Sequence, residues 1–178
     1  MATREPRHEI WQRDGEAAIQ YQRCAVRYLL GPWAPELVKC ASPCPGDRVL
    51  DVACGTGLVS RLAAQTVGPR GRVTGLDILP AMLAVARAVP HGGGAWIDWR
   101  EGDATTLPFP NASFDIVFCH QGLQFFSDRR ATLCEIHRVL ALGGRVAFAV
   151  WSYIERNPYF RTLADAVERH VGRRRAGK

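Results

Sequence analysis

The chain has 178 residues, of which 47% are hydrophobic and 22% are charged. This length and composition suit one globular domain with a sizeable core and leave little room for a second. No apolar run approaches the length of a membrane-spanning helix, and the polar residues 1–8 lack the apolar centre of a secretory signal. We therefore expect a cytoplasmic protein without a membrane span.

The formal net charge of +6 is concentrated at the C-terminus, where Arg173, Arg174, Arg175 and Lys178 supply four of these charges. The rest of the chain is close to neutral. No aromatic residues are interleaved with these basic residues, which favours a solvated terminus over a nucleic-acid-binding surface. We expect no nucleic-acid partner.

The six cysteines form neither a C-x-x-C pair nor a cluster with nearby histidines. The pattern therefore predicts no disulfide, no zinc and no other metal site. Cys54, Cys119 and Cys134 lie in apolar segments and are expected to be small buried hydrophobic residues.

The first part of the chain is predicted to be helical over residues 11–30, up to Gly31-Pro32, and again over residues 34–40. These helices carry Trp11, Tyr21 and Trp33. The three aromatic residues suit either a cover over a pocket mouth or packing against the edge of a sheet.

From residue 48 onward, strand-like and helix-like runs alternate. Strands are expected from residue 48 up to Gly55, and then over residues 72–78, 95–100, 114–120 and 145–151. Helices are expected over residues 58–67, from Pro80 to the residues before His91, and over residues 128–140 and 157–171. Gly143 and Gly144 are expected to cap the helix before the fifth strand. The alternation predicts an α/β fold with a doubly wound, mainly parallel sheet, in which ligands bind beyond the carboxyl ends of the strands.

The first strand leads into Gly55-Thr56-Gly57 and then into a helix. Glycines here allow a tight turn and a close approach of a ligand to the backbone, and the free amides of the helix N-terminus offer hydrogen-bond donors. This stretch is therefore predicted to form the floor of a ligand site.

Three carboxylates lie in or beside the ends of the first three strands: Asp51, Asp77 and Asp103. Each one alone is explained equally well as a cap of the following helix. Together they favour a ligand with ribose hydroxyls, an adenine amine and a cationic end, and they disfavour a pyrophosphate. The expected ligand is an adenosine carrying a cationic amino-acid end, a description that fits S-adenosylmethionine (SAM).

Successive motifs resemble those of class I SAM-dependent methyltransferases, most of all the ubiquinone/menaquinone C-methylase group. The motifs are Val49 to Gly57, Gly75-Leu76-Asp77, Glu101-Gly102-Asp103-Ala104 with Leu107-Pro108-Phe109, Phe114-Asp115-Ile116-Val117, and Glu135 to Leu140 with Gly143-Gly144-Arg145. The resemblance covers about residues 45–151 and implies a Rossmann-like sheet of about five strands in the order 3-2-1-4-5.

The resemblance implies SAM as the cofactor and a set of residues around it. Asp51 would orient the ammonium, Asp77 would accept from the ribose hydroxyls, and Asp103 with the Ala104 amide would contact the adenine edge. The complete implied set is Asp51, Ala53, Gly55, Gly57, Asp77, Ile78, Met82, Asp103, Ala104, Cys119, Gln121 and Gln124.

Methyl transfer is an in-line displacement that depends mainly on positioning, so no catalytic residue is assigned. His120 is the candidate base because histidine titrates near neutral pH, and the alternative is a hydrogen-bonded structural histidine at a strand end. The acceptor is expected to be a small molecule. Aromatic residues that suit either an acceptor or a core are Trp11, Trp33, Phe125, Phe126, Trp151 and Tyr153.

The chain divides into a helical cap (residues 1–44), a SAM-binding core (45–151) and a C-terminal helix with a basic tail (152–178). Family members usually continue with a strand hairpin, which this chain lacks, so we expect an exposed fifth-strand edge that favours self-association. Two alternatives remain: a shortened SAM-binding or interaction module without catalysis, and an NAD(P)- or FAD-dependent oxidoreductase. Against the oxidoreductase, Ser60 replaces the third glycine of G-x-G-x-x-G, and Asp51 would repel a pyrophosphate.

Overall fold

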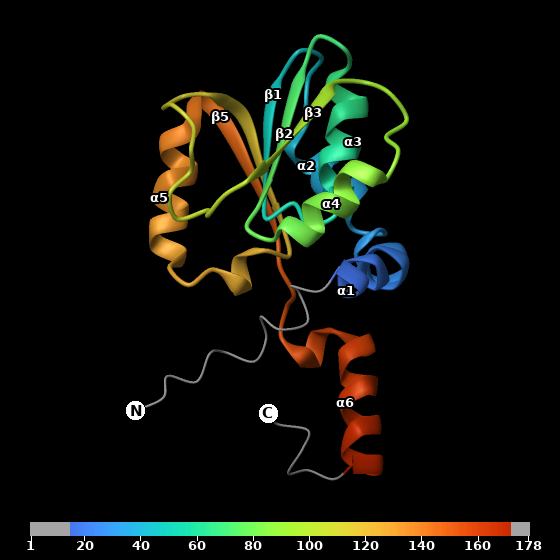
Figure 1. The fold of residues 1–178 in the computed structure, drawn as a ribbon. Helices are drawn as coiled ribbons and strands as arrows, with labels where there is room; N and C mark the ends of the chain where they lie inside the picture. The colour runs from blue at the N-terminus through green and yellow to red at the C-terminus, as the bar shows by residue number, and fades with distance from the viewer. Residues whose placement is uncertain (1–14, 172–178) are drawn as a thin grey trace, which may run out of the picture.

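Five parallel strands form one sheet in the order β3-β2-β1-β4-β5 in the computed structural model, which describes residues 15–171 (Figure 1). The strands are β1 (Arg48–Val52), β2 (Arg72–Asp77), β3 (Trp96–Glu101), β4 (Phe114–His120) and β5 (Leu140–Ala149). The strand order reverses between the neighbours β1 and β4, and ligands of such sheets bind at this point. The predicted Rossmann-like sheet and its strand order are confirmed.

Seven helical segments longer than one turn accompany the strands within the described residues. They are α1 (Gly15–Gln20), η2 (Tyr21–Leu30), α2 (Ala34–Ala41), α3 (Leu58–Val67), α4 (Pro80–Ala88), α5 (Arg129–Val139) and α6 (Pro158–Val171). Two short 3₁₀ turns, η3 (Leu123–Phe125) and η4 (Ile154–Arg156), follow β4 and β5.

The helix expected over residues 11–30 is present from residue 15 to residue 30, as α1 followed directly by η2. Residues 11–14 lie outside the described part of the chain, and η2 is a π-helix whose wider turns end with the Gly31 amide donating to the Val26 carbonyl at 2.8 Å. The π-helical turns carry Tyr21, whose ring lies at the functional site described below.

The sheet has a separate apolar core on each face, as expected for strands that are buried on both sides. On one face, α2 and α3 cover side chains that include Val49, Val73 and Phe118. On the other face, α5 covers a second cluster that includes Leu50 and Val117. Figure 1 shows α2, α3 and α4 on one side of the sheet and α5 on the other.

Two expectations around α5 are wrong. The helix passes directly into β5 at Leu140, and Gly143 and Gly144 lie inside that strand, where the register with β4 jumps between its partners Leu140 and Arg145. Gly143 takes a positive φ of 76° within this irregular stretch, so it serves a bulge and not a helix cap. Cys134 is exposed, because α5 turns Thr132, Ile136 and Val139 toward the sheet. Cys54 and Cys119 are buried as predicted.

Contacts with α5 hold the loop that follows β3. Arg138 donates to the carbonyls of Leu107 (2.9 Å) and Phe109 (2.8 Å), while Glu135 accepts from the Leu107 amide at 2.8 Å. These bonds fix the loop that leads from Asp103 back to β4. The Glu-x-x-Arg pair of the sequence therefore has a structural task next to the ligand site.

The last elements are weakly attached to the rest of the fold. Figure 1 shows α6 beyond the end of the sheet, and none of the side chains of α6 is buried. The structure confirms that β5 is an edge strand, and Val146 and Val150 are 43% and 52% exposed. Over residues 15–171, no helix combines the length and apolar character needed to cross a membrane.

Candidate functional site

A cavity of about 500 Å³ lies at the carboxyl ends of β1, β2 and β4, where the topology predicts a ligand. Its walls come from the loop after β1, from the β2–α4 junction and from the loops after β3 and β4. The structure brings together eight of the residues predicted from the sequence: Ala53, Gly55, Asp77, Ile78, Met82, Asp103, Ala104 and Gln121.

The carboxylate of Asp77 ties the glycine loop to the second strand. Its Oδ2 accepts from the Gly55 amide at 2.7 Å, and its Oδ1 accepts from the Leu79 amide at 2.9 Å. Burial raises the pKa of Asp77, and its backbone hydrogen bonds act in the opposite direction. The group is thus a fixed acceptor on the cavity wall with lone pairs left for hydroxyl donors.

Two residues in the left-handed region mark the ends of the central strands. Ala53 follows β1 with φ of 56°, and Gln121 follows β4 with φ of 59°; both line the cavity. Such conformations are uncommon for residues other than glycine and cluster where a ligand must approach the backbone. The buried Oε1 of Gln121 accepts no hydrogen bond from residues 15–171.

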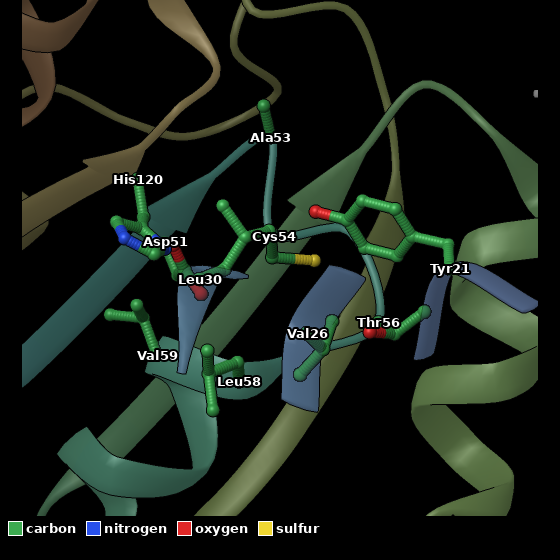
Figure 2. Close-up of a pocket in the computed structure, with 10 residues that line it drawn as sticks. All are labelled: Tyr21, Val26, Leu30, Asp51, Ala53, Cys54, Thr56, Leu58, Val59 and His120. Atoms are coloured by element: carbon green, nitrogen blue, oxygen red, sulfur yellow. The ribbon is translucent and has the colours of Figure 1, made fainter. Parts of the chain in front are cut away.

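A second cavity of about 20 Å³ adjoins the first, and Tyr21, Ala53 and His120 line both. Figure 2 shows the Tyr21 hydroxyl directed toward the loop at Cys54, with Asp51 and His120 on the opposite side of the cavity. This small cavity lies between η2 and the start of α3. The N-terminal helices therefore help to enclose the end of β1.

Asp51 is the deepest charged group of the site and is only 1% exposed. Its Oδ2 accepts a hydrogen bond of 2.6 Å from the Ser60 hydroxyl, while its Oδ1 has no partner among the described residues. Burial raises the pKa of Asp51 to about 7, opposed by the bonds from Ser60 and, more weakly, by the charge of Arg61. A buried carboxylate oxygen without a donor is costly, and a cationic or N–H-bearing ligand would relieve that cost.

The electrostatics of both cavities favour a positive ligand. Burial, followed by the charges of Asp77 and Asp51, raises the pKa of Tyr21 to about 12, so its hydroxyl stays protonated. Burial lowers the pKa of His120, so its ring is neutral at pH 7. The cavity walls thus combine two buried carboxylates with neutral hydroxyl and imidazole groups.

Three predicted site residues lie outside both cavity linings. Gly57 is the N-cap of α3 with φ of 82°, and a Cβ there would overlap the ring of Trp99. Cys119 is fully buried in the core on the α5 side of the sheet. Gln124 lies in η3, where its carbonyl accepts from Arg129 at 3.2 Å. Their assignment to the ligand stays a prediction.

The aromatic residues proposed to bind an acceptor also divide into some that line a cavity and others that do not. Phe125 and Phe126 line the large cavity, whereas Trp33, Trp151 and Tyr153 do not, and Trp11 is outside the described residues. Of the residues proposed to cover a pocket mouth, Tyr21 lines both cavities and Trp33 is 57% exposed.

Ser60 is the functional residue whose role sequence reasoning missed. It was noted only as a departure from a glycine pattern, yet it is fully buried and is the hydrogen-bond donor to Asp51. A polar residue on the apolar face of a short helix, just after a strand that ends in a carboxylate, was the available signal. Within residues 15–171, no group of three His, Cys, Asp or Glu side chains is placed to hold a metal ion.

Comparison with known proteins places this site in a family. Residues 50–148 match the model of a methyltransferase domain. The chain is 42% identical over 117 residues to a 2-phytyl-1,4-naphtoquinone methyltransferase of Synechococcus elongatus, covering 65% of this chain and 50% of the relative. It is 38% identical over 135 residues to the ubiquinone/menaquinone biosynthesis C-methyltransferase UbiE of Xanthomonas campestris, covering 75% and 53% of the two chains.

A crystal structure of a SAM-dependent methyltransferase from Aquifex aeolicus shares the fold. Its TM-score is 0.68 at 19% identity, covering 92% of this chain and 88% of that chain. The chain belongs to the methyltransferase domain family and has the fold of the class I SAM-dependent methyltransferases. It spans about half the length of the curated relatives named here. The alternative readings as an oxidoreductase or a non-catalytic module gain no support.

SAM is the cofactor of this family, and the residues present fit it. The buried Oδ1 of Asp51 lacks a donor within the described chain, which suits an ammonium, and Gly55 has only Tyr21 near its missing Cβ, at 3.6 Å.

Proposed function

We propose that this chain binds SAM in the large cavity, with its cationic end directed toward Asp51, and transfers its methyl group to a small aromatic acceptor. The observation that carries the proposal is the pairing of a 500 Å³ cavity walled by Asp77 with the donor-deficient Asp51 beside it. The first suits a nucleoside with ribose hydroxyls, and the second suits a cationic amino-acid end.

The proposed contacts follow the lining of the large cavity. Asp77 accepts from the ribose hydroxyls, and Ile78 and Met82 pack against the adenine. Asp103 and Ala104 contact the adenine edge, while Ala53, Gly55 and Gln121 flank the methionine part. Ile78 is 59% exposed and Met82 is 4% exposed, so Ile78 lies on the open side of the cavity and Met82 on its buried side.

The chemistry that SAM supplies is an electrophilic methyl group on a sulfonium. The contribution of this chain is to hold donor and acceptor in line, to exclude water and to keep negative charge near the cation. The neutral His120 ring lines both cavities and is available to receive a proton from an acceptor. No other histidine lines either cavity in the part of the chain described here.

The acceptor class is supported by the cavity and by the relatives. Phe125 and Phe126 line the large cavity. The relatives named above are, by name, a 2-phytyl-1,4-naphtoquinone methyltransferase and a ubiquinone/menaquinone biosynthesis C-methyltransferase. We propose an apolar molecule with a quinol-type ring, methylated on carbon. The cytoplasmic location expected from the sequence stays a prediction.

Two measurements test the proposal. Isothermal titration with SAM, S-adenosylhomocysteine and NAD should show binding of the first two and none of NAD. A methyl-release assay with a panel of hydroquinones should then show turnover. Binding of NAD in place of SAM would overturn the cofactor assignment, and SAM binding without turnover on any acceptor would favour the binding module.

We further propose that β5 mediates self-association. The strand is 10 residues long, pairs with β4 on one side, and carries exposed Val146 on a sheet edge. Exposed edges of this kind pair with other strands.

A further inference from the structure

Three residues that line the small cavity carry buried polar atoms without a partner in residues 15–171. One of these atoms is the hydroxyl oxygen of Thr56, and the other two are Oδ1 of Asp51 and Nε2 of His120. Figure 2 shows the two side chains on the same side of the cavity, with Thr56 across from them. Leaving both atoms unsatisfied is unfavourable, since one belongs to a buried carboxyl group that has lost its hydration.

The size of the cavity limits what can satisfy them. Its volume of about 20 Å³ is enough for one water molecule, which needs roughly 10–15 Å³ by this measure and two to four polar partners. A larger ligand would have to displace Leu30, Val59 or the β1 loop, which close the space.

We infer that one water molecule bridges Asp51 Oδ1 and His120 Nε2, and that His120 thereby acts as a positioning residue for the Asp51 carboxylate. His120 donates its Nε2–H to the water, and the water donates to Oδ1. The carboxylate then receives donors on both oxygens, because Ser60 donates to Oδ2. The bridge favours the ionised form of Asp51, the form that attracts an ammonium.

Other groups around Asp51 do not replace this donor. Asp77 on β2 raises the pKa of Asp51 through its charge, and Arg61 on α3 lowers it through its charge. The hydroxyls of Tyr21 and Thr56 also line the cavity, and neither donates to Asp51. Cys119 on β4 is held neutral by burial, which raises its pKa to about 12. The neutral imidazole of His120 is the proposed partner of the water, and the unpartnered Thr56 hydroxyl is the competing partner that the Thr56→Val variant tests.

The titration of Asp51 in the ligand-free protein tests the bridge without any cofactor. The carboxyl carbon of Asp51, followed by NMR, should titrate about one pH unit higher in His120→Leu than in the wild type, because one donor to the carboxylate is lost. His120→Gln keeps an N–H donor, so Asp51 should titrate close to its wild-type pH in this variant. Thr56→Val, which removes the other unpartnered hydroxyl of the cavity, should leave the titration unchanged.

The same variants report on regulation of the proposed SAM site, and this part rests on the proposed function. The pH at which SAM affinity falls by half should rise by about one unit in His120→Leu and stay near the wild-type value in His120→Gln. A high-resolution crystal structure should show the water in the wild type and not in His120→Leu.

The outcomes separate the two proposals. Equal titration of Asp51 in the wild type and both His120 variants, or equal shifts in both variants, would overturn the bridge. If SAM fails to bind the wild type at any pH, the proposed function fails, and the NMR titration and the crystal structure still decide on the water. Should His120→Leu not fold, the comparison of His120→Gln with His120→Ala gives the same decision.

Discussion

Ser60 on α3 donates a hydrogen bond of 2.6 Å to Oδ2 of Asp51 on β1, and both residues are almost completely buried. The helix that follows the glycine loop thus stabilises the carboxylate at the centre of the site. Ser60 stands at the third glycine position of the nucleotide-binding pattern, and Asp51 is the carboxylate that favours a cationic ligand. The hydrogen bond joins these two residues.

Ser60→Ala should destabilise the fold in a pH-dependent way. At pH 8 Asp51 is ionised and loses its donor, so the free energy of unfolding should fall by about 1–3 kcal/mol. At pH 5 the protonated carboxyl needs that donor less, and the loss should be smaller. Urea denaturation at both pH values measures the effect, with the exposed Thr66→Ala on the same helix as control. The same loss at both values would contradict the ionic origin.

The stability of the protein should carry a component from Asp51 that falls as pH rises. Burial raises the pKa of Asp51 from 3.8 in the unfolded chain to about 7 in the folded protein. Between pH 3.8 and 7 the folded state binds this proton and the unfolded state does not, so the stability that protonation contributes decreases as the pH rises. The component is on the order of 4 kcal/mol and is lost as the pH rises through 7. The difference between the stability curves of the wild type and Asp51→Asn isolates it; a difference that is flat from pH 4 to 8 would refute it.

Asp77→Ala should weaken SAM binding by about 1–3 kcal/mol, or roughly 5- to 150-fold, because charged hydrogen bonds to the ribose are lost. The measurement is isothermal titration at pH 8. Asp98→Ala on β3 is the matched control, since that carboxylate is exposed and pairs with Arg100 at 2.7 Å. Unchanged affinity in Asp77→Ala would remove the ribose role.

Gly57→Ala should destabilise the fold by about 2–4 kcal/mol through a strained positive φ and overlap with Trp99. Gly46→Ala is the control, because Gly46 has φ of 95° but nothing within 4 Å of a Cβ, so only the strain of about 1 kcal/mol applies. Thermal or urea denaturation separates the two costs. Trp99→Leu should recover part of the Gly57→Ala loss, and equal losses in the two alanine variants would argue against the overlap.

Val146→Lys should reduce self-association. A charged side chain on an exposed edge disfavours pairing with a second strand, and Val146 is 43% exposed on β5. Light scattering coupled to size-exclusion chromatography, compared with Leu133→Lys on the exposed face of α5, measures the effect. A wild-type protein that stays monomeric at high concentration would contradict the proposed self-association through β5.

Much of the fold could be predicted because its signals are local. The helix over residues 58–67 and the strand over residues 114–120 were predicted with the boundaries that the structure shows. The π-helical turns of η2, the direct passage from α5 into β5 and the exposure of Cys134 were not, because each depends on how one element packs on another. Cys134 shows this clearly: its helix has apolar residues on more than one face, and only the sheet selects which face is buried.

The sequence by itself determined the parallel sheet, its glycine loop and the positions of Asp51, Asp77 and Asp103 at the strand ends, since these follow from periodicity and from turn chemistry. Only the tertiary structure decided that Asp77 and Asp103 line one cavity while Asp51 lies in a smaller one beside it, with Ser60, Tyr21 and His120. The reason is physical: burial and hydrogen bonding of a carboxylate depend on side chains from α3, η2 and β4, and chain spacing does not encode the distances between them.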